Sequence, residues 1–184
     1  YAKGEYFLFL HADSEIENQF QLKNALDLME GLTQPSAGHF KINFFCEDPR
    51  VKKFLSFFEW KSFFNREGTF SGDQGLLISR KNFDSFGRFS EEFGFLEDKE
   101  FAERFSEIGN LVTLPGEIKS SGRRFEVEGA GERATLNLLI MSMFHLKLFD
   151  FFVVAPSIYR EALDSKKLNL FPFFQNALHQ IVGD

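Results

Sequence analysis

The segment that decides the fold runs from residue 6 to residue 13 and has the sequence Tyr-Phe-Leu-Phe-Leu-His-Ala-Asp. Its first five residues form a short continuous apolar run, which predicts a strand covered on both faces. The four residues that follow this segment, Ser14 to Glu17, have the form of a capping box. Apolar residues then follow at helical spacing: Leu22, Leu26, Met29 and Leu32. We therefore predict a strand, a polar turn and a helix, with Asp13 at the turn where ligands bind in open α/β sheets.

The rest of the chain continues this alternation of strands and helices. The predicted strands cover residues 38–45, 75–78 and 112–114. The predicted helices cover residues 49–65, 97–108 and 132–152, with a last amphipathic stretch at 157–181. Residues 82–95 are predicted to be loop-like and 118–127 extended. The pattern predicts the α/β class.

Composition narrows the function classes before any motif is considered. The chain has 184 residues, enough for one domain with a real core. A formal charge of −6 argues against a general nucleic-acid binder. The single cysteine, Cys46, excludes an intramolecular disulfide framework. The first residue is Tyr1 and the predicted strand follows almost at once, so we expect the chain to begin inside a domain.

Two segments raise the question of a membrane. Residues 136–155 have the length of a bilayer span, but Asn137, His145, Lys147 and Asp150 lie within them. A buried or partner-facing helix is the favoured interpretation, with an interfacial helix as the alternative. The helix at 49–65 has Phe54, Phe57, Phe58 and Phe64 as its predicted apolar side. The basic residues of the 50–66 segment fit a solvated face, or a phosphate or lipid contact.

Four polar clusters punctuate the α/β pattern. They are His11 to Asp13, Gly72 to Gln74, Glu97 with Asp98, and Arg123 with Arg124. Each has an ordinary explanation when taken alone. An Asp after a strand and a Gly-Asp-Gln turn are commonly local turn chemistry. Acidic residues at a helix start complement the helix dipole, and paired arginines are commonly surface charges.

Asp98 has a placement that strengthens its cluster. It shares a helix face with Phe101 and Phe105, which turns its carboxylate inward at the start of the predicted helix. A carboxylate there is placed to accept a proton from a substrate hydroxyl. The helix N-terminus lowers the pKa of such a carboxylate, and apolar neighbours raise it. The sequence leaves the balance between these two effects open.

Four motifs together, in this order and spacing, are typical of one family. They are Leu8 to Asp13 (Leu-Phe-Leu-His-Ala-Asp), Gly72 to Gly75 (Gly-Asp-Gln-Gly), Leu96 to Asp98 (Leu-Glu-Asp) and Ser120 to Phe125 (Ser-Ser-Gly-Arg-Arg-Phe). From Ala2 to Tyr159 the chain resembles the family 2 glycosyltransferases of the GT-A fold, a Rossmann-like mixed sheet flanked by helices. Within them it is most similar to the bacterial subgroup with a Leu-His-Ala-Asp motif, associated with radical-SAM and selenium-related gene clusters.

The resemblance implies an enzyme of the hexosyltransferase kind, which moves a sugar from a nucleotide-sugar donor to an acceptor hydroxyl with inversion. Asp13 matches the last Asp of the family's DXD motif, which implies a Mg²⁺ or Mn²⁺ ion bridging the donor's diphosphate. His11 stands where the family has the first Asp, so this motif supplies no pair of carboxylates. His11 is then either a second metal ligand or a hydrogen-bonded turn residue.

The remaining site residues are also implied by the resemblance. Asp98 matches the general base and Glu97 supports it. The Gly72 to Gln74 segment, with Asp73 at its centre, matches residues near the donor sugar and the acceptor. Arg123, Arg124 and Phe125 match the family's Gln-x-x-Arg-Trp element, in which the arginine steadies the diphosphate. This chain departs there, because Phe125 replaces the Trp and lacks its indole N–H.

The family's first βαβα portion, which binds the nucleoside, has no counterpart in this sequence, so we expect an N-terminally truncated GT-A domain. Residues 1–130 are predicted to form its metal, acceptor and catalytic-base side. Residues 131–184 are predicted to form a helical extension that packs on it or on a partner. A non-catalytic fragment or binding module, and a peripheral membrane protein, are the alternative functions.

The expected partners are a nucleotide-sugar donor and an acceptor of unknown identity, for which lipid-linked compounds are candidates. Nucleic acid is not an expected partner. A membrane surface or a homo-oligomer through the 132–155 helix is a further expectation. The expected location is the cytoplasm, with the inner-membrane surface as the alternative.

Overall fold

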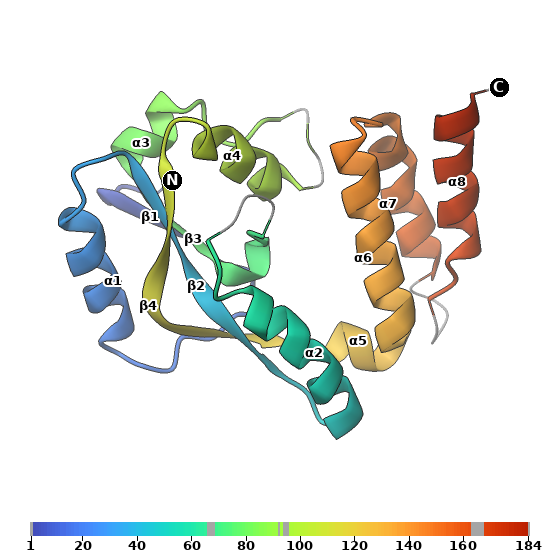
Figure 1. Cartoon of the computed structure of the whole chain (residues 1–184), viewed down its shortest axis with the longest axis horizontal. Coiled ribbons are helices and arrows are strands. Elements are labelled where there is room, and N and C mark those ends of the chain that lie inside the picture. The colour runs from blue at the N-terminus through green and yellow to red at the C-terminus, as the bar shows by residue number, and fades with distance from the viewer. Residues whose placement is uncertain (1, 66–68, 92, 94–95, 163–167, 184) are drawn as a thin grey trace. The chain divides into compact units, whose positions relative to one another are not determined.

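The computed structural model describes residues 2–65, 69–91, 93, 96–162 and 168–183 (Figure 1). The chain forms two compact units. The sheet unit comprises Tyr1–Glu47 and Lys52–Ser121, and the helical unit comprises Asp48–Val51 and Gly122–Asp184. The helical unit thus begins before residue 131, where the sequence analysis placed the helical extension. Sequence features at Tyr1, at Arg66, at 94–95 and at 163–167 lie outside the described residues.

A four-stranded mixed sheet organises the first unit. Its strands are β1 (Tyr6–Phe9), β2 (Ser36–Phe45), β3 (Leu76–Ser79) and β4 (Asn110–Ser121), in the order β1-β3-β2-β4. β3 is antiparallel to both of its neighbours, whereas β2 and β4 are parallel. The predicted α/β class and its mixed sheet flanked by helices are confirmed, and the architecture is compatible with a Rossmann-like fold.

Helices cover both faces of this sheet (Figure 1). On one face α1 (Gln21–Glu30) packs Ala25 and Met29 against apolar residues of β2, β3 and β4. On the other face α3 (Arg80–Ser85) and α4 (Glu97–Ser106) pack Phe83, Phe101 and Phe105 against β2 and β3. Since successive strand residues point to opposite faces, both layers draw on the same strands.

Phenylalanine supplies much of the core beneath α3 and α4. The rings of Phe9, Phe83, Phe89 and Phe101 contact one another with centroids 4.7 to 5.4 Å apart. All of these pairs are edge-to-face or tilted, as the ring quadrupole favours. The 27 phenylalanines of the chain therefore include a continuous aromatic core next to the start of α4.

Two predicted boundaries of the sheet unit are wrong. Helix α1 begins at Gln21 rather than after Ser14, because Glu15 exchanges two backbone hydrogen bonds with Lys119 of β4 and is held extended. The predicted short strand at 112–114 continues through Pro115 to Ser121, since β2 pairs with β4 along almost its whole length. Part of the predicted loop at 82–95 is helix α3.

Helix α2 (Pro49–Lys61) begins where it was predicted but ends at Lys61 rather than at residue 65, and its apolar side was predicted wrongly. Phe54 and Phe57 are exposed, and Leu55 is the buried residue of the helix. The helix is held to β2 by polar side chains instead, of which Glu59 accepts a 2.6 Å hydrogen bond from the backbone N–H of Phe44. Hydrophobic periodicity in the sequence does not predict polar contacts of this kind.

The second unit is a group of helices, α5 (Arg123–Glu128), α6 (Ala130–His145), α7 (Asp150–Ala162) and α8 (Phe171–Val182). The single helix predicted at 132–152 is two helices, separated where Lys147 takes a left-handed φ of 58°. The segment predicted to be extended through residue 127 contains α5. Within the described ranges, each helix falls short of the length and apolarity needed to cross a bilayer.

A buried polar contact joins three helices of this second unit. Glu128 of α5 accepts hydrogen bonds from Arg133 of α6 at 3.2 Å and from the Tyr159 hydroxyl of α7 at 2.6 Å. Glu128 is 8 % exposed, so its charge is compensated where water is largely excluded. Burial is the largest cause that raises the pKa of Tyr159, followed by its hydrogen bond to Glu128.

The aromatic core predicts the cost of removing one ring. Phe101 is fully buried, so Phe101→Ala should lower the free energy of unfolding of the sheet unit by about 3–5 kcal/mol. Denaturant unfolding followed by the fluorescence of Trp60, the single tryptophan, measures it. Phe20, which is 59 % exposed, is the matched control, and Phe20→Ala should change stability by less than about 0.5 kcal/mol. Equal losses in the two variants would contradict the described core.

Candidate active site

The pairing of β1 with β3 brings together two of the polar clusters. The strands are antiparallel, and Phe9 at the end of β1 lies opposite Leu76 at the start of β3. The turn after β1, which contains His11, therefore adjoins the 3₁₀ turn η1 (Gly72–Gln74) just before β3. The end of one strand and the approach to the next thus build a common polar site.

His11 and Asp73 form the direct contact of this site. Nδ1 of His11 lies 3.0 Å from Oδ1 of Asp73, and both side chains remain partly exposed. The hydrogen bond to Asp73 is the largest cause that raises the pKa of His11, and the negative charges of Asp98 and Asp13 add to it. The imidazole therefore lies among three carboxylates that favour its protonated form.

Asp98 lies in the first turn of α4 and reaches the same place. Phe101 and Phe105, which share a helix face with Asp98, are fully buried. Their burial confirms that this face of the helix points inward, as predicted. Burial is the largest cause acting on the carboxyl and raises the pKa of Asp98, against a hydrogen bond from the backbone N–H of Lys99 at 2.8 Å. The balance that the sequence left open therefore falls on the side of desolvation.

Gly72 separates Asp98 from His11 and leaves no room for a side chain. A Cβ at this position would lie 2.0 Å from Oδ2 of Asp98 and 2.8 Å from Nε2 of His11. Both atoms therefore contact the same small volume above the glycine. Three segments far apart in the sequence, at residues 11, 72–73 and 98, meet here.

A buried amide network fixes the turn that carries Gly72 and Asp73. Gln74 is 1 % exposed, and its Nε2 donates to Nδ1 of His39 at 2.8 Å and to the Phe40 carbonyl at 3.2 Å. Its Oε1 accepts from the backbone N–H of Ser71 at 3.0 Å. Since Nδ1 of His39 accepts, Nε2 carries the proton and donates to Oδ1 of Asn65 at 2.5 Å.

This network assigns Gln74 a different position from the one expected. Its side chain points into the fold and its amide is used there, so it supports the turn rather than facing a donor sugar. His39, buried in β2, was missed by the sequence analysis. Its only sequence signal is a histidine in an otherwise apolar strand, next to the alternating Phe40, Ile42 and Phe44.

The other predicted site residues lie at the margin or in the other unit. Asp13 is exposed in the turn after His11, and its charge acts on the pKa of His11. Glu97 is exposed, and its charge contributes to raising the pKa of Asp98. Arg123, Arg124 and Phe125 form the first half of α5, which belongs to the helical unit.

The described residues provide no ready set of ligands for the Mg²⁺ or Mn²⁺ ion that the resemblance implies. Across the described part of the chain, no group of three or more His, Cys, Asp or Glu side chains is placed to hold a metal ion. Nδ1 of His11 is engaged by Asp73, and its Nε2 faces Asp98 across Gly72. The side chains that the structure describes do not fit a complete Mg²⁺ or Mn²⁺ site.

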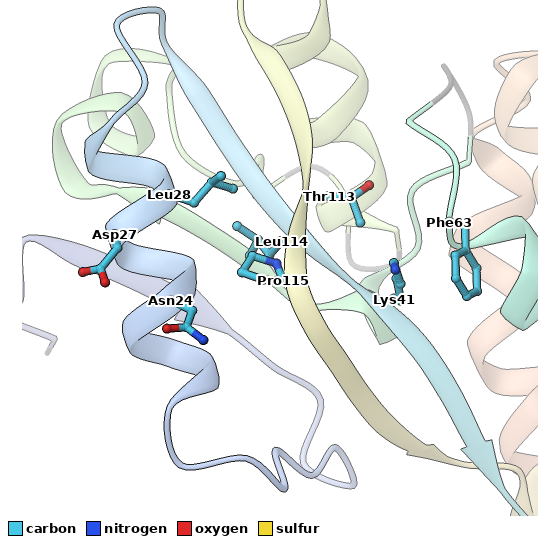
Figure 2. A pocket seen from close by; sticks show the side chains of 8 residues that line it. All are labelled: Asn24, Asp27, Leu28, Lys41, Phe63, Thr113, Leu114 and Pro115. Carbon is cyan, nitrogen blue, oxygen red and sulfur yellow. The ribbon is translucent and has the colours of Figure 1, made fainter.

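A hollow of about 750 Å³ lies elsewhere in the sheet unit (Figure 2). Figure 2 shows side chains of α1, β2 and β4 around it, with Pro115 on β4 and Phe63 beyond Lys41. It is wide open, and its lining contains none of the residues His11, Asp73 and Asp98. The candidate site is therefore defined by converging polar side chains and not by this hollow.

Comparisons of the chain with protein-family models, with curated proteins and with solved structures give no match.

The close approach at Gly72 predicts a specific intolerance. Gly72→Ala should lower the free energy of unfolding by about 1–3 kcal/mol, because the new methyl group overlaps the Asp98 carboxylate and the His11 ring. Denaturant unfolding measures it. Gly31→Ala is the control in the same unit, since a Cβ there meets its nearest atom at an ordinary 3.4 Å. A Gly72→Ala protein as stable as Gly31→Ala would contradict this packing.

Burial of His39 predicts a pH dependence of stability. Desolvation is the main cause that lowers the pKa of His39, so the unfolded chain binds a proton more readily than the folded one. Stability is therefore fully present above the ordinary histidine pKa of about 6.5 and is lost as the pH falls below it. Thermal unfolding of the native protein and of His39→Gln over this range measures it. The stability difference between the two should shrink at acidic pH, and a constant difference would exclude the neutral buried imidazole.

Proposed function

We propose that the sheet unit carries the catalytic side of an inverting glycosyltransferase of the family 2, GT-A kind. The observation that carries the proposal is the meeting of His11, Gly72 with Asp73, and Asp98 at one end of the sheet. These residues belong to three of the motifs on which the resemblance to that family rests. A mixed sheet covered on both faces supports the proposal, because it is compatible with the Rossmann-like architecture of the GT-A fold.

Asp98 has the role of general base in this proposal. Its carboxylate removes the proton from an acceptor hydroxyl, and the oxygen attacks the anomeric carbon of the donor sugar. The bond from that carbon to the diphosphate oxygen breaks, and the nucleoside diphosphate leaves with the electron pair. A single displacement of this kind inverts the anomeric centre. Burial supports the role, because a raised pKa makes Asp98 a stronger base than an exposed aspartate.

His11 and Asp73 have orienting roles. The 3.0 Å contact holds the imidazole by Nδ1, which turns Nε2 toward Gly72 and Asp98. Glu97, exposed beside Asp98, adds negative charge that further favours proton uptake by that carboxyl. Gly72 lets the Asp98 carboxylate and the His11 ring pack directly against its backbone, where any side chain would overlap both. We propose that the acceptor hydroxyl approaches the Asp98 carboxylate from the solvent.

A divalent cation has no step in this mechanism. Mg²⁺ or Mn²⁺ would supply positive charge to the leaving diphosphate, but the described side chains do not form a site for it. Arg124 of α5 also has no step in this mechanism. Its charge-assisted contact to a diphosphate remains a prediction from the resemblance.

Loss of the base tests the proposal. Asp98→Asn should lower the release of nucleoside diphosphate from nucleotide-sugar donors by about 10²- to 10⁴-fold, because an amide takes up no proton from the acceptor. The assay is run on the chain with a panel of donors, with Mg²⁺ or Mn²⁺ and with a chelator. Asp84→Asn is the matched control, since Asp84 is an exposed partner of Arg88 and should leave turnover unchanged.

Two outcomes contradict the transferase. One is release of nucleoside diphosphate that is equal in Asp98→Asn and in the unsubstituted chain. The other is donor binding by calorimetry without any turnover, which would establish the alternative, a non-catalytic binding module of the same fold.

A further inference from the structure

Helix α2 turns its polar side toward the sheet. Besides the bond from Phe44 to Glu59, Ser62 just beyond the helix accepts a 3.0 Å hydrogen bond from the backbone N–H of Ile42. The Lys52 ammonium pairs with the same Glu59 carboxylate. Amphipathic surface helices normally turn their apolar stripe to the core, whereas α2 buries only Leu55 and turns several polar side chains inward.

The outer side of α2 is aromatic and cationic. Lys53, Phe57, Trp60 and Lys61 follow at the i, i+4, i+7 and i+8 positions, which lie on one helix face. The side chains of Phe57 and Trp60 are 60 % and 59 % exposed, and their ring centroids lie 6.2 Å apart. We call these four residues the α2 outer face.

The chain after the helix extends the same chemistry. Phe63 is 46 % exposed. The Lys41 ammonium lies 4.6 Å from the centre of the Phe63 ring, and both side chains are labelled in Figure 2. Aromatic rings beside lysines are the composition of interfacial helices, whose rings enter the headgroup boundary while the ammonium groups meet lipid phosphates.

The charge of the α2 outer face selects its partner. Among the described residues, the ion pairs of the sheet unit engage neither Lys53 nor Lys61. These cations stand out on a chain whose formal charge is −6. An anionic surface complements them. A second copy would place the same two lysines against each other.

We propose that the α2 outer face is a docking surface for an anionic lipid bilayer, with Phe57 and Trp60 inserted at the headgroup boundary. The proposal places the membrane contact on α2, within the 50–66 segment for which a lipid contact was one of the alternatives, and not on the 132–155 segment. It does not depend on the transferase activity, so its test stands whatever the outcome for Asp98.

The single tryptophan of the chain lies in this face and reports on it directly. Vesicles of equal parts phosphatidylcholine and phosphatidylglycerol should shift the emission of Trp60 to the blue, and bromine-labelled acyl chains should quench it. Phosphatidylcholine alone should do neither. Lys53→Gln and Lys61→Gln should each weaken cosedimentation with the anionic vesicles about fivefold, since one cation near such a surface contributes about that factor.

Two further variants complete the experiment. Phe57→Ala should reduce cosedimentation at least as much as the loss of one lysine. Phe20→Ala removes an equally exposed ring outside α2 and should leave cosedimentation unchanged. Both positions are exposed, so circular dichroism should show an unchanged fold in each.

Three results would overturn the proposal. The first is the absence of binding to the anionic vesicles at low salt. The second is binding that leaves Trp60 unquenched, which would place the membrane contact on another surface. The third is a blue shift of Trp60 that grows with protein concentration without lipid, which would assign the face to a second copy of the chain.

Discussion

The antiparallel pairing of β1 with β3 is the constraint on which the candidate site depends. It sets Phe9 opposite Leu76, and so fixes which residues of the following turn meet those of η1. A slip of one residue would turn the alternating faces of β1 over, because strand side chains have a period of two. Phe7 and Phe9 would then leave the aromatic core, and His11 would lose its place beside Asp73. The packing of the aromatic core therefore fixes the register of β1 against β3, on which the site depends.

The sequence predicted well those features that depend on local pattern. The apolar run at 6–10, the helix at the Glu97–Asp98 motif and the inward face of Asp98 are confirmed, since each follows from periodicity within a few residues. The meeting of His11, Asp73 and Asp98 was implied only by a resemblance, because strand order is a non-local property. The raised pKa of Asp98 depends on its desolvation by segments distant in the sequence, which local pattern does not reveal.

The errors share a physical origin in contacts between distant segments. The capping box at Ser14 is overridden because Glu15 pairs with Lys119, more than a hundred positions along the chain. The apolar side of α2 was predicted from ring spacing, whereas polar bonds to β2 decide its orientation. The break before α7 depends on one left-handed residue, Lys147, that carries no glycine or proline signal. Local rules hold where no distant partner competes with them.

The buried network behind η1 has a direction. Gln74 donates to His39, which must then donate to Asn65, so both protons point from the turn toward Asn65. The hydroxyl of Thr113 on β4 also donates to that Asn65 oxygen, which ends the chain in an acceptor. A glutamate in place of Gln74 would have nearly the same shape but no amide hydrogens, and the whole order would have to reverse or break. At this position the arrangement of protons, more than volume, restricts which side chain the fold accepts.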